Sequence, residues 1–300
     1  MANPALVLIL LLVAAGYVSA RLRLFPEDAA DVLNRFVLYV CLPATILYRV
    51  PGLRFRSDLV VLAAMPWLLL GLVIALVLLA SRMFGWRREV TGALLLCVPL
   101  GNTSFLGFPM LEALVSPDAV RLAVVYDQLG SFVMLATFGL VVQARYGGIG
   151  EADARTMAKR IATFPPFLAL VAAIAISPFG LPPAAEPVLK RVGDALVPLA
   201  MFAVGLKTRI RPPVDRGPFV FGLLVKMLVL PLVAWGLVTL LGTAPDVARV
   251  AVFESAVPPM ITAGALAMMA GLAPELSAAL VGYGIVLSMA TLPAWAAVLR

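Results

Sequence analysis

The sequence contains no histidine, only two cysteines, and few charged residues, which make up 13% of the 300 positions. The absence of histidine removes the commonest metal ligand and the commonest general base, which disfavours enzymes that depend on either. Cys41 and Cys97 each lie inside an apolar run, so we expect reduced packing residues instead of a disulfide framework. Because a soluble domain carries about a quarter charged residues, the composition also excludes an ordinary globular protein.

Apolar residues dominate what is present, at 63% of the chain with a mean hydropathy of +1.05. Apolar runs recur along the whole length, which indicates one polytopic membrane domain. The net charge of +7 is scattered between these runs and is not gathered on one face. We therefore expect the lipid bilayer as a partner, and no nucleic acid.

A membrane-crossing helix needs about 20 mostly apolar residues. No basic residue precedes the first such segment, so we expect it to be a retained span and not a cleaved signal peptide. Ten segments meet the length rule: 4–20, 29–48, 58–80, 90–115, 119–143, 161–177, 188–206, 218–241, 247–271 and 275–298.

Basic residues in the connections predict the orientation of these spans. If the N-terminus is outside, the basic loops at 82–88, 145–160 and 207–216 lie inside, and the inner side carries more Lys and Arg than the outer side. The positive-inside rule then favours a multi-pass protein of the inner membrane with both termini outside, in the periplasm.

The two halves of the chain are similar to each other. "SPDAVRLAVVYDQLGSFVML", which starts at Ser116, aligns with "APELSAALVGYGIVLSMATL", which starts at Ala273, at a constant offset of 157 that pairs Tyr126 with Tyr283. A repeat with an odd number of spans enters the membrane inverted, and inverted repeats are typical of secondary transporters. Chance similarity between Leu-, Val- and Ala-rich helices is the alternative. The predicted units are a first inverted repeat (1–143), a central cytoplasmic linker (144–160) and a second inverted repeat (161–300).

Helix-breaking residues interrupt the fourth and ninth spans, which correspond under this offset. The interruptions are "CVPLGNTSFLGFPM" at 97–110 and "FESAVPPMITAG" at 253–264. Irregular backbone persists in a membrane only when it is buried in protein or lines a wet cavity. If both breaks lie near mid-membrane they can cross, and the N-termini of the half-helices would then present partial positive charge to an anion. The alternative is a pair of proline kinks accommodated by neighbouring helices.

Polar residues at the two breaks are therefore the candidates for binding an anionic solute. The candidate substrate-binding residues are Gly101, Asn102, Thr103, Ser104, Pro258, Pro259, Met260 and Thr262. Charged residues inside the spans are costly and usually pair or line a pathway, and Asp127, Glu254 and Lys226 are the main candidates. Either carboxylate is a candidate proton carrier. The alternative is static pairing, of Lys226 with Glu254 or of Arg35 with Asp194. No catalytic residue, metal ligand or cofactor is predicted.

Several motifs resemble the auxin efflux carrier family of transporters, which includes the plant auxin exporters. The motifs are "LGNTSFLGFPML" in the fourth span, "YDQLGSF" at 126–132, "LVPLAMFAVGLKTR" at 196–209 and the stretch 254–293. The resemblance implies an all-α fold of ten transmembrane helices in two inverted five-helix repeats, with broken helices 4 and 9 crossing. Spans 1, 2, 6 and 7 would form a scaffold, and spans 3–5 and 8–10 a transport domain.

The same resemblance implies an elevator-type transporter of organic anions, often a homodimer. Asn102 matches the asparagine that contacts the substrate carboxylate, and Pro258 or Pro259 matches the proline of the second crossing. The short central connection departs from the large hydrophilic loop of the plant exporters, so regulation through that loop is not expected.

Our leading hypothesis is a secondary transporter of a small organic anion, a carboxylate, and not an enzyme. A sodium-coupled symporter of the bile-acid or arsenite transporter type is the near alternative, which a sodium-gradient dependence of uptake would favour. A membrane sensor that binds without transport is a different class, which binding without flux would favour. An intramembrane enzyme is disfavoured because no Ser or Cys stands beside a plausible base.

Overall fold

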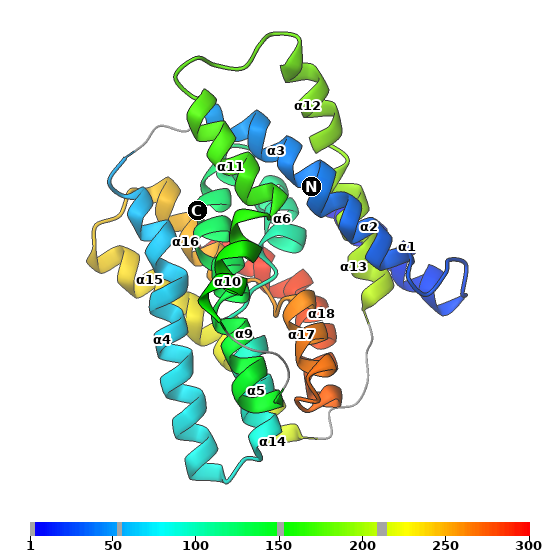
Figure 1. Ribbon diagram of the computed structural model, residues 1–300, viewed down its shortest axis with the longest axis vertical. Helices are drawn as coiled ribbons and strands as arrows, with labels where there is room; N and C mark the ends of the chain where they lie inside the picture. Colours follow the sequence, from blue (N-terminus) through cyan, green and yellow to red (C-terminus); the bar gives the residue numbers. More distant parts are fainter. Residues whose placement is uncertain (1–3, 53–55, 149–152, 209–214) are drawn as a thin grey trace.

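The computed structural model describes residues 4–52, 56–148, 153–208 and 215–300, and within these ranges the regular structure is entirely helical (Figure 1). The first half contains α1 (Pro4–Arg21), α2 (Ala29–Phe36), η1 (Val37–Cys41), α3 (Leu42–Arg49), η2 (Val50–Gly52), α4 (Leu59–Phe84), α5 (Arg88–Cys97), η3 (Thr103–Gly107), α6 (Phe108–Leu114), α7 (Ala119–Tyr126), η4 (Asp127–Ser131), α8 (Phe132–Ala136), α9 (Phe138–Val142) and η5 (Gln143–Gly147). The second half contains α10 (Ala154–Ala162), α11 (Pro165–Ile176), α12 (Ala185–Gly193), α13 (Leu196–Lys207), α14 (Arg216–Leu224), η6 (Val225–Val229), α15 (Leu230–Leu240), α16 (Pro245–Ala256), α17 (Ile261–Met269) and α18 (Pro274–Val298). The segment η2 is a 3-10 helix and the other η segments are π-helical.

Six continuous helical segments in the described part of the chain are long and apolar enough to cross a membrane. They are Pro4–Arg21, Ala29–Arg49, Leu59–Phe84, Ala119–Gly147, Arg216–Leu240 and Pro274–Val298. A seventh arises if α10 and α11, which are bent by 61° at their junction, form one span. The other predicted spans consist of shorter helices, α5 with α6, α12 with α13, and α16 with α17, so the count of ten remains a prediction.

The predicted central linker is partly helical, because 144–160 includes the end of η5 and most of α10. Asp153 begins α10 by accepting a hydrogen bond from the Thr156 backbone N–H, a common N-capping arrangement. Residues 149–152 of this linker, and 209–214 of the basic loop 207–216, lie outside the described residues.

The helices pack into two groups. In one group α1 lies along α13, and α3 contacts α11 and α12 (Figure 1). The backbones of α1 and α13 come close together, since a methyl group added at Gly205 would lie 2.9 Å from the Cα atom of Gly16. Only glycine allows two helix backbones to come this near, as is common in membrane helix pairs. We call α1–α3 and α11–α13 the first group.

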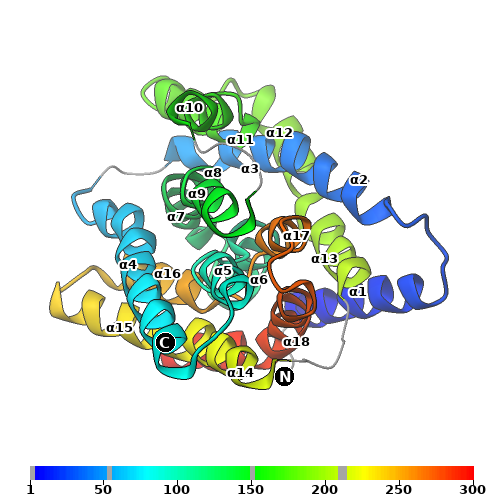
Figure 2. The same cartoon turned by 60° about the horizontal axis from the view of Figure 1, so that its bottom comes forward.

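The second group contains α4–α9 and α14–α18. Figure 2 shows α5, α6, α7 and α17 near its middle, with α4, α14 and α15 along one side and the first group along the other. Nearly every residue of α5 and of the second half of α16 is buried. The two interrupted segments therefore lie in the interior of the protein, where an irregular backbone is shielded from lipid.

Candidate functional site

The two predicted interruptions are present, and they contact each other. Between α5 and η3 the chain is non-helical at Leu100–Asn102, and between α16 and α17 it is non-helical around Pro258 and Pro259. The Asn102 N–H donates to the Pro258 carbonyl at 2.9 Å, and the Met260 N–H donates to the Leu100 carbonyl at 2.8 Å. An antiparallel bridge thus joins Gly101 to Pro259. These N–H and carbonyl groups lack helical partners because the helices are interrupted, and they pair with each other across the junction, as buried backbone groups must.

Two short helical segments begin at this junction. Asn102 precedes η3, which continues into α6, and Met260 precedes α17. The first N–H groups of a helix lack partners within it, so both segments direct unpaired donors and partial positive charge toward the junction. An anion is the complementary ligand for such an arrangement.

Asn102 is the polar side chain closest to the junction in sequence, and it is 1% exposed. Neither its amide nitrogen nor its amide oxygen has a hydrogen-bond partner among the described residues. A buried amide without partners costs about 1–3 kcal/mol per unsatisfied group. Such a cost persists in a native protein when the group has a ligand to bind, and Asn102 offers both a donor and an acceptor.

Asp127 lies beside the first break and is held by three donors. The hydroxyl of Thr103 donates to its Oδ1, Ser104 Oγ donates to the same oxygen at 2.7 Å, and Gln128 Nε2 donates to Oδ2 at 2.6 Å. The carboxylate is 2% exposed. Asp127 therefore accepts three hydrogen bonds close to the start of η3. The hydroxyl hydrogens of Thr103 and Ser104 are therefore already donated to Asp127, so toward a ligand these two hydroxyl groups can act only as hydrogen-bond acceptors.

Glu254 and Lys226 approach the first break from two other helices, α16 and η6. The Glu254 carboxylate packs against Gly107, where an added methyl group would lie 2.5 Å from Oε2, and the Lys226 ammonium packs against Gly101, where it would lie 2.9 Å from Nζ. Glu254 is fully buried, and neither of its carboxylate oxygens has a hydrogen-bond partner among the described residues. Lys226 is 2% exposed.

No carboxylate in the described part of the chain forms an ion pair with Lys226 within 4.0 Å. The static pair of Lys226 with Glu254 is therefore wrong as a direct contact, although the two charges attract at longer range. The second static pair is also wrong, because Asp194 pairs with Lys190 at 2.8 Å and not with Arg35. Buried ionisable groups without a direct partner are expensive, which indicates a functional reason for keeping them.

The remaining predicted residues divide between the interior and the surface. Pro258 and Pro259 are buried at the junction, and Met260 is half-buried. Thr262 is exposed on the first turn of α17, so its side chain is not part of the buried cluster in this conformation.

Gln128 was not among the predicted site residues, although it follows Asp127 directly in the quoted motif. Its side chain is fully buried, donates to Asp127, and has an amide oxygen without a partner in the described ranges. The sequence feature that could have identified Gln128 is its polar amide side chain inside an otherwise apolar span. Gly107 was also missed, because only the fold reveals that Glu254 occupies the space beside it.

Two cavities lie beside the helices that follow the breaks. One, of about 340 Å³, is lined by Pro109 of α6 and by the first turn of α13. The other, of about 350 Å³, is lined by Ile261 of α17 and by Lys207 at the last residue of α13. The cavities thus lie toward opposite ends of α13, and each touches the helix that follows one of the breaks.

These features define a class, the membrane transport proteins, because interrupted helices meet at a buried polar cluster inside an apolar helical bundle. The chain belongs to the membrane transport protein (Mem_trans) family, the auxin efflux carrier family, whose model matches residues 2–296. A transporter of Methanothermobacter thermautotrophicus described as uncharacterized is 30% identical over 298 residues, 97% of this chain and 96% of the relative. Another, from Methanocaldococcus jannaschii, is 28% identical over 208 residues, 66% of each chain. The chain is a multi-pass membrane transporter.

Proposed function

We propose that the protein is a secondary transporter that moves a small organic anion, a carboxylate, by an elevator-type alternating-access mechanism. The observation that carries this proposal is Asn102: a buried amide that has no hydrogen-bond partner in the described part of the chain, placed where two helix N-termini converge. The amide nitrogen of Asn102 and the N–H groups that follow it would donate to the carboxylate.

The hydrogen bonds at the junction support an inverted repeat of ten spans. Met260 lies 158 positions after Asn102, and Pro258 lies 158 positions after Leu100. A shift by this length therefore exchanges the two cross-junction hydrogen bonds, Asn102 to Pro258 and Met260 to Leu100. This local symmetry is expected when two inverted units cross at their breaks, and the shift differs by one residue from the sequence offset of 157.

The packing supports a division into scaffold and transport domain. The first group would be the scaffold (spans 1, 2, 6 and 7), and the second group, which contains both breaks, would be the transport domain. Asn102 and Glu254 are closed off from solvent in this conformation, while the two cavities lie toward opposite ends of α13. Movement of the second group along the first would open the cluster to one side at a time.

Glu254 is our candidate for proton coupling, in preference to Asp127. Asp127 accepts hydrogen bonds from three donors, whereas Glu254 accepts none from the described residues. A carboxyl group in such surroundings can bind and release a proton as an anion arrives or leaves. Lys226 would contribute positive charge next to Gly101, on the side of the anion.

A binding experiment tests the site. Purified protein is screened for thermal stabilisation by acetate, benzoate, succinate and citrate, alongside Asn102→Ala and the matched control Asn34→Ala on α2. We expect at least one carboxylate to stabilise the wild type, and Asn102→Ala to weaken its affinity about tenfold to hundredfold, since a hydrogen bond to a charged group contributes roughly 1.5–3 kcal/mol. The proposal fails if no carboxylate binds, or if both variants behave like the wild type.

A flux experiment tests transport and coupling. Uptake of the stabilising carboxylate into proteoliposomes is measured under a pH gradient and, separately, under a sodium gradient. We expect the pH gradient to drive accumulation in the wild type but not in Glu254→Gln. Dependence on sodium would favour the sodium-coupled alternative, and binding without flux would favour the sensor. We also propose an inner-membrane location with both termini outside, and a homodimer, in line with the loop charges and the family resemblance.

A further inference from the structure

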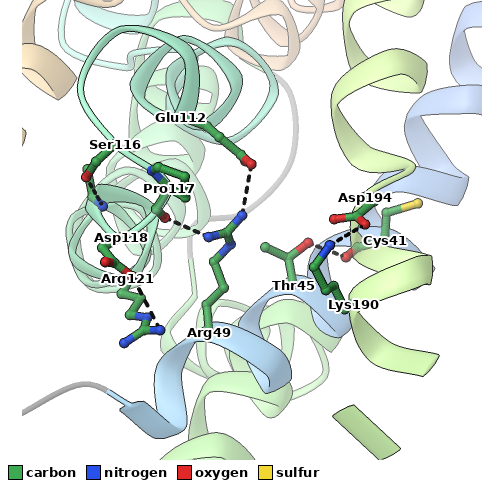
Figure 3. A network of polar contacts seen from close by, with 11 residues as sticks. Cys41, Thr45, Arg49, Glu112, Ser116, Pro117, Asp118, Arg121, Lys190 and Asp194 are labelled. Atoms are coloured by element: carbon green, nitrogen blue, oxygen red, sulfur yellow. Dashed lines mark hydrogen bonds and ion pairs between the residues drawn. The ribbon is translucent and has the colours of Figure 1, made fainter. Parts of the chain in front are cut away.

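The first cavity contains charged side chains that the proposed transport mechanism does not use. It lies between the two helix groups, near the last turn of α3 (Figure 3). Arg49 of α3 and Glu112 of α6 occupy one side, and Lys190 and Asp194 occupy the other. We call this cavity the Arg49 pocket.

Arg49 reaches from the first group to the second. Its NH2 group donates to Glu112 Oε1 at 3.0 Å, and its NH1 group donates to the Pro117 carbonyl at 2.7 Å, as the dashed lines in Figure 3 show. The Arg49 side chain is 12% exposed and the Glu112 side chain 37%. Among ion pairs between described residues, this is the one that joins the two groups.

The guanidinium group of Arg49 has unused binding capacity. It carries five N–H donors in a planar fork that suits a carboxylate, and only two of its hydrogen bonds go to described residues. The remaining donors belong to a side chain that lines a cavity of about 340 Å³, which is large enough for a small organic acid. Lys190 on the opposite wall likewise forms one ion pair with the described residues, to Asp194 at 2.8 Å.

The position of the pocket connects it to the junction. Pro109 lines the pocket and is two residues beyond Gly107, against which Glu254 packs. A solute in the pocket is therefore next to the helix that begins at Asn102.

We propose that the Arg49 pocket is a second carboxylate-binding site, in which the guanidinium of Arg49 exchanges Glu112 for the carboxylate of the transported solute before the solute reaches Asn102. This inference rests on the proposed function, because it requires a carboxylate as the solute. The exchange also releases the ion pair between the two groups, so solute in the pocket removes a contact that holds them in this arrangement.

Direct binding measurements on substituted proteins test this assignment. The dissociation constants of succinate and benzoate are measured for the wild type, Arg49→Gln, Glu112→Gln and Asn102→Ala. The control is Arg21→Gln, an exposed arginine whose side chain, among the described residues, donates hydrogen bonds only to Tyr17 of α1. We expect Arg49→Gln to weaken binding about tenfold or more, as for other lost charge-assisted contacts, and Arg21→Gln to leave it unchanged.

Glu112→Gln separates a binding role from a structural one. If Glu112 competes with the solute for Arg49, then its neutralisation tightens binding, by roughly threefold or more, while it weakens the contact between the groups. A purely structural ion pair would predict equal or weaker binding in both variants. This measurement stands even if Arg49→Gln does not fold.

The outcomes distinguish the two proposals. If Asn102→Ala abolishes binding while Arg49→Gln and Glu112→Gln leave it unchanged, the Arg49 pocket is overturned and the proposed function stands. If Arg49→Gln abolishes binding while Asn102→Ala does not, the pocket is supported as the primary site and the role of Asn102 is wrong. If neither succinate nor benzoate binds to the wild type, both proposals fail for these solutes.

Discussion

The two buried carboxylates differ in their hydrogen-bond partners. This difference predicts that neutralising Asp127 lowers the free energy of unfolding much more than neutralising Glu254. Asp127 accepts hydrogen bonds from Thr103, Ser104 and Gln128, whereas Glu254 accepts none from the described residues. Asp127→Asn and Glu254→Gln each replace a carboxylate with an amide of the same shape. The change in the free energy of unfolding therefore reports on the contacts and not on side-chain size.

The expected magnitudes follow from the donor count. Asparagine at position 127 keeps one oxygen acceptor and turns a nitrogen donor toward one of the present donors, so at least one hydrogen bond is lost and one contact becomes repulsive. Hydrogen bonds to charged groups contribute about 1.5–3 kcal/mol each, so Asp127→Asn should lower the free energy of unfolding by about 2–5 kcal/mol. Glu254→Gln removes no hydrogen bond to the described residues, so its effect should stay within about 1 kcal/mol.

Thermal unfolding in detergent, followed by tryptophan fluorescence, measures the difference. At about 2 °C per kcal/mol for a chain of this size, Asp127→Asn should lower Tm by about 4–10 °C while Glu254→Gln shifts it by no more than about 2 °C. Asp118→Asn, whose side chain is 79% exposed, serves as the control and should match the wild type. Equal shifts for the two buried positions, or a larger loss at Glu254, would show that the described hydrogen bonds do not determine their roles.

Three further predictions concern other parts of the fold. Gly205→Ala should lower the free energy of unfolding by about 1–3 kcal/mol, because the added methyl group meets the α1 backbone. Gly71→Ala has open space around it and should raise the free energy of unfolding by about 0.5–1 kcal/mol. Both effects are measured as changes in Tm. The hydrogen bonds that Asp153 accepts at the start of α10 lower its pKa. The contribution of this cap to the stability of α10 is therefore present above the ordinary aspartate pKa and is lost as the pH falls through the lowered pKa. Amide hydrogen exchange in α10 should rise over that pH range, and Asp153→Asn should remove this pH dependence. A cysteine introduced as Arg300→Cys should react with an impermeant maleimide from the periplasmic side, against a low background because both native cysteines are buried; labelling from the cytoplasmic side alone would reverse the proposed orientation.

Local chemistry made much of the fold predictable. Long apolar runs can only be membrane helices, and prolines with glycines inside such runs must interrupt them. The positions of both interruptions followed from the residues at 97–110 and 253–264, and the structure places the two interruptions in contact. The buried, reduced state of both cysteines also agrees with the prediction from their apolar surroundings.

Partner choice between distant side chains was less predictable. The pairing of Asp194 with Lys190 instead of Arg35 depends on which face of α12 each residue occupies, and a single sequence does not specify the neighbouring helix. The same holds for Thr103 and Ser104, whose hydroxyls donate to Asp127, and for Arg49, which was not among the predicted site residues. Such contacts depend on helix rotation and register, which tertiary packing determines.

The pair of backbone hydrogen bonds between Leu100–Asn102 and Pro258–Met260 has a mechanical consequence. Sliding one interrupted helix past the other would break both bonds in a region without water to replace them, at a cost of several kcal/mol. The two interrupted helices are therefore joined to each other through their backbones. Any displacement that exposes the polar cluster would therefore occur at the boundary with α1, α3 and α13, which the Arg49 side chain bridges through Glu112 and the Pro117 carbonyl.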